Sequence, residues 1–137
     1  MSYLAWAVAA LVLYTLVPPL VKLTTRDAPT DVVAFATNLV LVVAAFALVV
    51  YNGHSVTEHL TGRTGMFMLL AGIGLAGGIL TYYHALSLGP VSVVTPIFGL
   101  FLVTSSVAGV VFLDESVNYS KIAAVILALA AIYLAQR

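Results

Sequence analysis

The chain of 137 residues contains no cysteine and very few charged residues. The absence of cysteine excludes disulfides, thiolate metal sites and cysteine nucleophiles. Charged residues make up only 7% of the sequence and hydrophobic residues 63%, whereas soluble domains carry about 25% charged residues. This composition excludes a water-soluble globular domain and predicts a protein whose solvent is mostly lipid.

An excess of charge of one sign is also missing. Five Lys and Arg balance five Asp and Glu, so the formal net charge is zero. A nucleic-acid-binding protein usually has a basic surplus, and a disordered tail often has an acidic run. We therefore expect the lipid bilayer as a partner and no nucleic acid.

Motifs for catalysis and for tightly bound cofactors are absent as well. The sequence has no nucleophile elbow, no phosphate-binding loop and no zinc-binding helix motif. His54 and His59 lie in a hydrophilic loop without a nearby third ligand, which makes a poor metal site. We therefore expect a protein that is not an enzyme and that has no cofactor and no bound metal.

Five long apolar runs occupy most of the sequence, over residues 3–23, 32–51, 66–88, 91–113 and 117–134. A helix of roughly 20 residues crosses the hydrocarbon core of a bilayer. The runs are continuous rather than alternating, which favours helices over barrel strands. No Lys or Arg precedes the first run, which favours a retained helix over a cleaved signal peptide. The fold class predicted for residues 1–137 is a single all-α integral membrane domain with five transmembrane helices.

The distribution of the few cations hardly predicts how the chain is oriented in the membrane. Cytoplasmic loops usually carry the excess of Lys and Arg, but here two cations on one side face three on the other: Arg63 and Lys121 against Lys22, Arg26 and Arg137. Either the count is too small to be informative, or the chain inserts both ways and pairs antiparallel. We expect Lys22 and Lys121, near the ends of their helices, to extend toward the interface.

Prolines interrupt two of the predicted helices. Pro18 and Pro19 lie near the end of the first, and Pro96 lies within the fourth. Because proline has no N–H, the carbonyl four residues earlier loses its helical partner. Broken helices beside a cavity are typical of transporter sites, and a simple packing kink is the alternative.

Small residues recur at helical spacing in two of the runs. Gly74 and Gly78 are four residues apart in the third run, and the fifth run has a stripe of four alanines: Ala124, Ala128, Ala131 and Ala135. Such spacing allows close helix contact. It predicts a tightly packed bundle or a dimer surface, and it does not indicate an activity.

Seven residues within the predicted helices are candidates for a solute-binding site: Tyr14, Asn38, Tyr82, Tyr83, His84, Thr95 and Pro96. The amide of Asn38 cannot be satisfied by lipid, so it faces either a cavity or a neighbouring helix. The segment Tyr82–His84 suits either the lining of an amphipathic passage or an interfacial belt. His84 alone could relay protons near neutral pH, and a structural role is its alternative.

The segment Tyr82–Ser92, followed by Pro96, the Asp114–Glu115 turn and the alanine-rich final run, resembles the EamA branch of the drug/metabolite transporter superfamily. The resemblance is specific over about half of the chain and looser in the first half. Asp114 replaces the usual turn glycine. Asn38 stands where many members have a second-helix arginine, which argues against recognition of substrates by charge.

The resemblance implies a plasma-membrane carrier of small organic metabolites or drugs that works by alternating access. Members often have ten spans formed by two inverted halves, and this chain resembles one half. It therefore implies an antiparallel homodimer with dual topology, whose central, mostly neutral cavity is lined by the first, third and fourth helices. Two other interpretations stay open: a non-transporting membrane subunit, and a flippase-like carrier of lipid-linked solutes, which would need an aromatic cluster open sideways to lipid.

Overall fold

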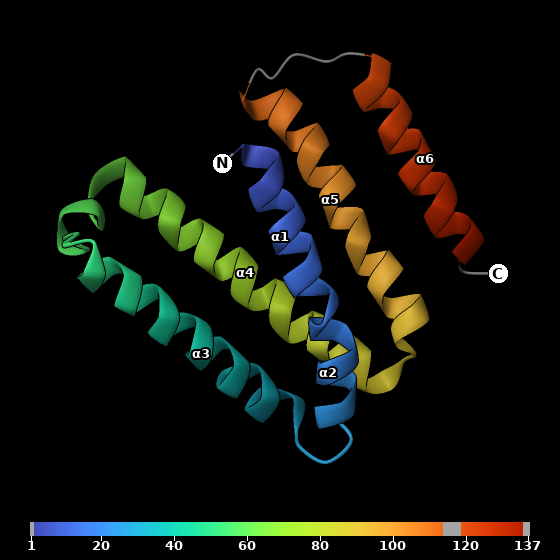
Figure 1. Ribbon diagram of the computed structural model, residues 1–137, viewed down its shortest axis with the longest axis horizontal. Helices are drawn as coiled ribbons and strands as arrows, with labels where there is room; N and C mark the ends of the chain where they lie inside the picture. Colours follow the sequence, from blue (N-terminus) through green and yellow to red (C-terminus); the bar gives the residue numbers. More distant parts are fainter. Residues whose placement is uncertain (1, 114–118, 136–137) are drawn as a thin grey trace. The chain divides into compact units, whose positions relative to one another are not determined.

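The computed structural model describes residues 2–113 and 119–135 of the chain, and these residues form helices joined by short connections (Figure 1). The elements are α1 (Tyr3–Thr15), α2 (Val17–Thr24), α3 (Thr30–Tyr51), the short 3-10 helix η1 (Thr57–His59), α4 (Gly62–Leu88), α5 (Val91–Leu113) and α6 (Tyr119–Ala135). Four stretches are long and apolar enough to cross a membrane: Tyr3–Thr24, Thr30–Tyr51, Gly62–Leu88 and Val91–Phe112. The predicted all-α membrane fold class is confirmed.

The helices fall into two compact units, Met1–Ser87 and Leu88–Arg137. In the second unit α5 packs along α6. The expectation of one five-helix domain stays a prediction. The Asp114–Glu115 turn, Arg137 and the side chains of Lys121 and of the four-alanine stripe lie outside the described residues.

The first predicted span consists of two helices, because α1 ends at Thr15 and α2 begins at Val17. Pro18 and Pro19 lie in the first turn of α2. Proline is tolerated there because the first N–H groups of a helix have no intrahelical acceptor. At the end of α1, the hydroxyl of Thr15 donates to the carbonyl of Leu11 at 2.8 Å.

Pro96 behaves differently, since α5 continues through it from Val91 to Leu113. The described helix therefore has no break at this proline. That Pro96 lies beside a cavity stays a prediction.

Within the first unit, α3 and α4 run antiparallel beside each other and are joined by a loop that contains η1 (Figure 1). α4 begins at Gly62, four residues before the apolar run that predicted it. Gly62 has a φ of 69°, a conformation that glycine adopts without steric cost. The helix includes Arg63, whose guanidinium lies 5.5 Å from the ring centroid of Phe67, so the boundary is set by backbone geometry rather than by apolarity.

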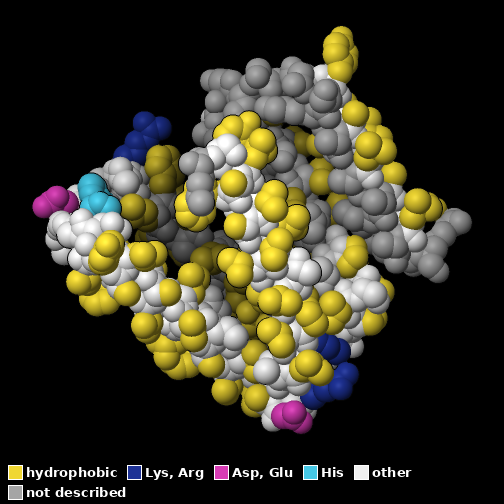
Figure 2. Space-filling view, in the orientation of Figure 1, with side chains coloured by type: hydrophobic (Ala, Val, Ile, Leu, Met, Phe, Trp, Pro, Cys, Tyr) yellow, Lys and Arg dark blue, Asp and Glu magenta, His cyan; other side chains and the backbone are white. Residues whose placement is uncertain are grey.

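Buried apolar side chains are few among the described residues: Pro18, Val21, Val33, Ala34, Tyr82, Tyr83 and Leu86. They come from α2, from the first turns of α3 and from the last turns of α4. Hydrophobic side chains cover the outer surface of the described helices, and the charged ones gather at the α3–α4 loop and at the α2–α3 connection (Figure 2). An apolar surface with charges at the helix ends suits a protein surrounded by lipid.

Candidate functional site

The seven buried residues come from α2, α3 and α4, which side-chain hydrogen bonds join to one another, and we call this set of residues the α2–α4 junction. Tyr82, Tyr83 and Leu86 lie on neighbouring positions of α4, because residues three and four apart share a helix face. Leu86 is 0% exposed. The junction therefore holds the buried residues of the described part of the first unit.

The two tyrosines of the junction pack against each other. Their ring centroids are 6.3 Å apart and the ring planes are tilted by 56°, an arrangement that aromatic pairs favour. Tyr82 is 5% exposed and Tyr83 is 4% exposed. Rings buried to this extent do not form a lipid-facing interfacial belt, and their role in lining a solute passage stays a prediction.

A polar contact joins α4 to α3 at the edge of the junction. The hydroxyls of Tyr83 and Thr37 are 3.3 Å apart, and the Thr37 hydroxyl lies 2.8 Å from the carbonyl of Val33. Because the Thr37 proton is directed to this carbonyl, the Tyr83 hydroxyl donates to Thr37. Thr37 is not among the seven residues predicted for the site, although its hydroxyl lies within a predicted span and next to Asn38.

A second polar contact joins α2 to α4. The sequence predicts that Lys22 extends toward the membrane interface, but its ammonium donates to the carbonyls of Leu86 at 2.7 Å and of Ser87 at 3.2 Å. These carbonyls belong to the last turn of α4, where helix carbonyls lack intrahelical partners and carry partial negative charge. The lysine thus caps the end of α4.

Asn38 lies one turn beyond the junction on α3. Its side-chain nitrogen donates to the carbonyl of Ala34 at 2.8 Å, and the residue is half-buried. Since residues four apart share a helix face, Asn38 continues the face that bears the buried Ala34. This contact satisfies one amide proton within its own helix.

Of the other predicted site residues, two are exposed in the first unit and two lie in the second unit. Tyr14 is 57% exposed on α1, and His84 is exposed on α4 although it follows the buried tyrosines. Thr95 and Pro96 are half-buried residues of α5, in the second unit. Of the seven candidates, the first unit therefore gathers Tyr82 and Tyr83, with Asn38 one turn away.

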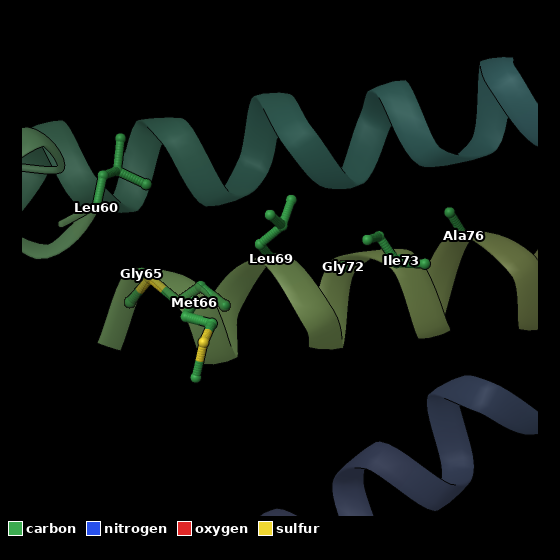
Figure 3. Close-up of a pocket in the computed structure, with 8 residues that line it drawn as sticks. Leu60, Gly65, Met66, Leu69, Gly72, Ile73 and Ala76 are labelled. Carbon is green, nitrogen blue, oxygen red and sulfur yellow. The ribbon is translucent and has the colours of Figure 1, made fainter. Parts of the chain in front are cut away.

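An apolar groove of about 680 Å³ lies along the N-terminal half of α4. It is lined by Leu60, Gly65, Met66, Met68, Leu69, Gly72, Ile73 and Ala76. Figure 3 shows Leu69 and Ala76 projecting from α4 toward α3. None of the seven predicted site residues lines this groove, and its lining offers no polar side chain to orient a solute.

Comparison with known proteins identifies the type of protein to which these helices belong. The EamA-like transporter family matches residues 1–136. The chain is also 27% identical over 118 residues to an "Uncharacterized transporter in cobO 3'region" of Sinorhizobium sp, and the match covers 85% of this chain and 84% of that relative. No solved structure matches the chain significantly. Since the family matches almost the whole sequence, the chain belongs to the EamA-like transporter family.

Proposed function

We propose that the protein is a secondary carrier of small organic metabolites or drugs. It works by alternating access as an antiparallel homodimer, whose two copies insert in opposite orientations. Its solute site contains Asn38, Tyr82 and Tyr83 of the first unit, together with the other predicted residues: Tyr14, His84, Thr95 and Pro96.

The proposal that this protein transports solutes across a membrane rests on the family match. The EamA-like transporter family covers residues 1–136, and the relative with 27% identity is named a transporter. With its apolar helices, the chain is a multi-pass protein of the plasma membrane. The match covers similar shares of both chains, so the relative that is named a transporter has about the same length as this chain.

The resemblance to one half of a ten-span carrier is the reason for proposing a homodimer. Carriers are commonly built from two inverted repeats with the solute at the repeat interface. We take this chain as one such repeat, and a second copy then supplies the other. The odd number of predicted spans and the two-against-three distribution of cations favour insertion in both directions.

Open space along α4 agrees with this pairing. A Cβ added at Gly74 or Gly78 would meet no atom within 4 Å. These glycines are four residues apart, so they lie on one face of α4. This face is available for the close approach of another helix.

The chemistry of the candidate site suits a neutral or weakly polar solute. Tyr82 and Tyr83, which are almost fully buried in this structure, provide aromatic faces and hydroxyl tips once alternating access opens the junction, and Asn38 provides an amide with donors and an acceptor. The five predicted spans contain no Asp or Glu, so a buried carboxylate that exchanges protons for a cation is not part of the proposed mechanism.

A flippase-like role is less well supported. It requires an aromatic cluster that opens sideways to lipid, whereas Tyr82 and Tyr83 are almost fully buried. The non-transporting subunit gains no specific support from the junction either. The carrier is therefore the function that the observations favour.

Purified protein in sealed proteoliposomes provides the test. We expect uptake or counterflow of at least one member of a broad metabolite panel, and none in protein-free liposomes. Thr81→Val is a matched control for substitutions within the spans, because the Thr81 hydroxyl donates to Gly77 in its own helix at 2.7 Å. Failure to move any solute, together with stoichiometric co-purification of another protein, would contradict the carrier and favour a subunit role.

A further inference from the structure

The contact between Lys22 and the end of α4 links segments that are far apart in the sequence. The ammonium lies 2.7 Å from the Leu86 carbonyl and 3.2 Å from the Ser87 carbonyl, and these residues follow Lys22 by 64 and 65 positions. Lys22 is half-buried. This contact joins the C-terminal end of α4 to a side chain of α2.

The proline pair sets up this contact. Because the helix is interrupted at Leu16, α2 forms a separate element of eight residues. Its Val21 is buried in the junction and 3% exposed. Burial of Val21 fixes the position of α2, and the neighbouring Lys22 reaches the carbonyls of α4 from there.

The carbonyls that Lys22 contacts are suited to a cation. α4 ends at Leu88, so Leu86 and Ser87 are in its last turn. Their carbonyls lack the N–H groups that a longer helix would supply, and they lie at the negative end of the helix dipole. Hydrogen bonds from a charged donor are stronger than neutral ones, and a low dielectric strengthens them further.

The same turns of α4 carry the tyrosine pair. Leu86 is one turn from both Tyr82 and Tyr83, and all three are buried in the junction. We infer that Lys22 is a positioning residue of the carrier: its ammonium holds the end of α4 against α2 and so fixes the tyrosine pair for solute movement. The effect on transport rests on the proposed function, whereas the effect on the end of α4 does not.

Hydrogen–deuterium exchange of the full chain in lipid nanodiscs tests the structural part. Lys22→Met removes the charge and the donors while keeping an unbranched side chain, and Lys22→Arg keeps both charge and donors. Arg26→Met is the control, because Arg26 is an exposed cation four residues further on. We expect the amides of residues 80–88 to exchange about tenfold faster in Lys22→Met, with little change in Lys22→Arg and Arg26→Met.

Equal exchange in Lys22→Met and Arg26→Met would overturn the inference. If Lys22→Met fails to fold, Lys22→Gln provides the same comparison, since it keeps a neutral donor and should exchange at an intermediate rate. Faster exchange in Lys22→Gln than in Arg26→Met supports the role of Lys22 in holding the end of α4, and equal exchange overturns it.

Transport in proteoliposomes tests the positioning role. Lys22→Met should lower the maximal rate about tenfold and change KM less, and Lys22→Arg should restore the rate. An unchanged rate in Lys22→Met, despite faster exchange, would overturn the positioning role. If the unmodified protein moves no solute, the proposed function fails, while the exchange experiment still decides whether Lys22 holds α4.

Discussion

The hydroxyl of Tyr83 lies 3.3 Å from the hydroxyl of Thr37, and this pair joins the buried Tyr83 of α4 to the exposed Thr37 of α3. The Thr37 hydroxyl also contacts the carbonyl of Val33 in its own helix. Thr37 therefore keeps a partner when Tyr83 is changed, whereas Tyr83 loses this partner when Thr37 is changed.

Removing either hydroxyl should lower the free energy of unfolding. We expect Tyr83→Phe and Thr37→Val to cost about 1 kcal/mol each, the net worth of one hydrogen bond. A double-mutant cycle, measured by unfolding in mixed micelles, should give a coupling of about 0.6 kcal/mol, as is usual for polar contacts between membrane helices. Additive effects of the two substitutions would contradict the contact.

Gly65 should be far less tolerant of a side chain than Gly72. A Cβ built on Gly65 would overlap the backbone carbonyl of Leu60, whereas one on Gly72 would meet no atom within 4 Å. We expect Gly65→Ala to destabilise the protein by about 1–3 kcal/mol, the usual cost of overpacking. Gly72→Ala is the matched control, and equal unfolding free energies of the two variants would show that the α3–α4 loop does not approach α4 this closely.

Larger side chains at Gly74 and Gly78 should weaken the proposed dimer without damaging the single chain. A Cβ at either position would meet no atom of the same chain within 4 Å. Leu at each position should therefore fit within the single chain but prevent the close approach of another helix. Crosslinking yield or light scattering in detergent would report the oligomeric state. A dimer that survives both substitutions would exclude this face of α4 as the contact surface.

The transmembrane helices were predictable from composition and length because lipid requires long apolar helices. Local sequence patterns were less informative about where each helix begins and ends. The proline pair at residues 18 and 19 indicated a disturbed first span, and the structure ends α1 at Thr15 and starts α2 at Val17. The start of α4 at Gly62 was missed because the helix extends beyond the apolar run.

The site was predictable only in part, and for a physical reason. Residue type singled out Tyr82 and Tyr83, and the structure buries them together. The partners Thr37 and Lys22 contact residues 46 and 64 positions away, and no periodicity within one helix reports such pairing. The exposure of His84 beside two buried tyrosines likewise depends on which face of α4 meets α2 and α3.

Two substitutions test the polar residues proposed for the solute site. Asn38→Leu and His84→Phe should each reduce transport about fivefold or more, which corresponds to the loss of one polar contact worth about 1 kcal/mol. The dimer should remain intact in both variants, while Thr81→Val should transport normally. Unchanged transport in Asn38→Leu and His84→Phe would remove both residues from the site.

The central claim is that one repeat makes a carrier by pairing with an oppositely inserted copy, and Thr57→Cys tests it most directly. Thr57 is exposed in η1 of the α3–α4 loop, and the sequence contains no other thiol to give a background. Intact cells are treated with a membrane-impermeant thiol reagent, and the labelling is repeated after permeabilisation. Labelling of about half of the molecules before permeabilisation, and of all of them afterwards, is the result expected for dual insertion. Labelling of all molecules or of none in intact cells would mean one fixed orientation and would contradict the antiparallel homodimer.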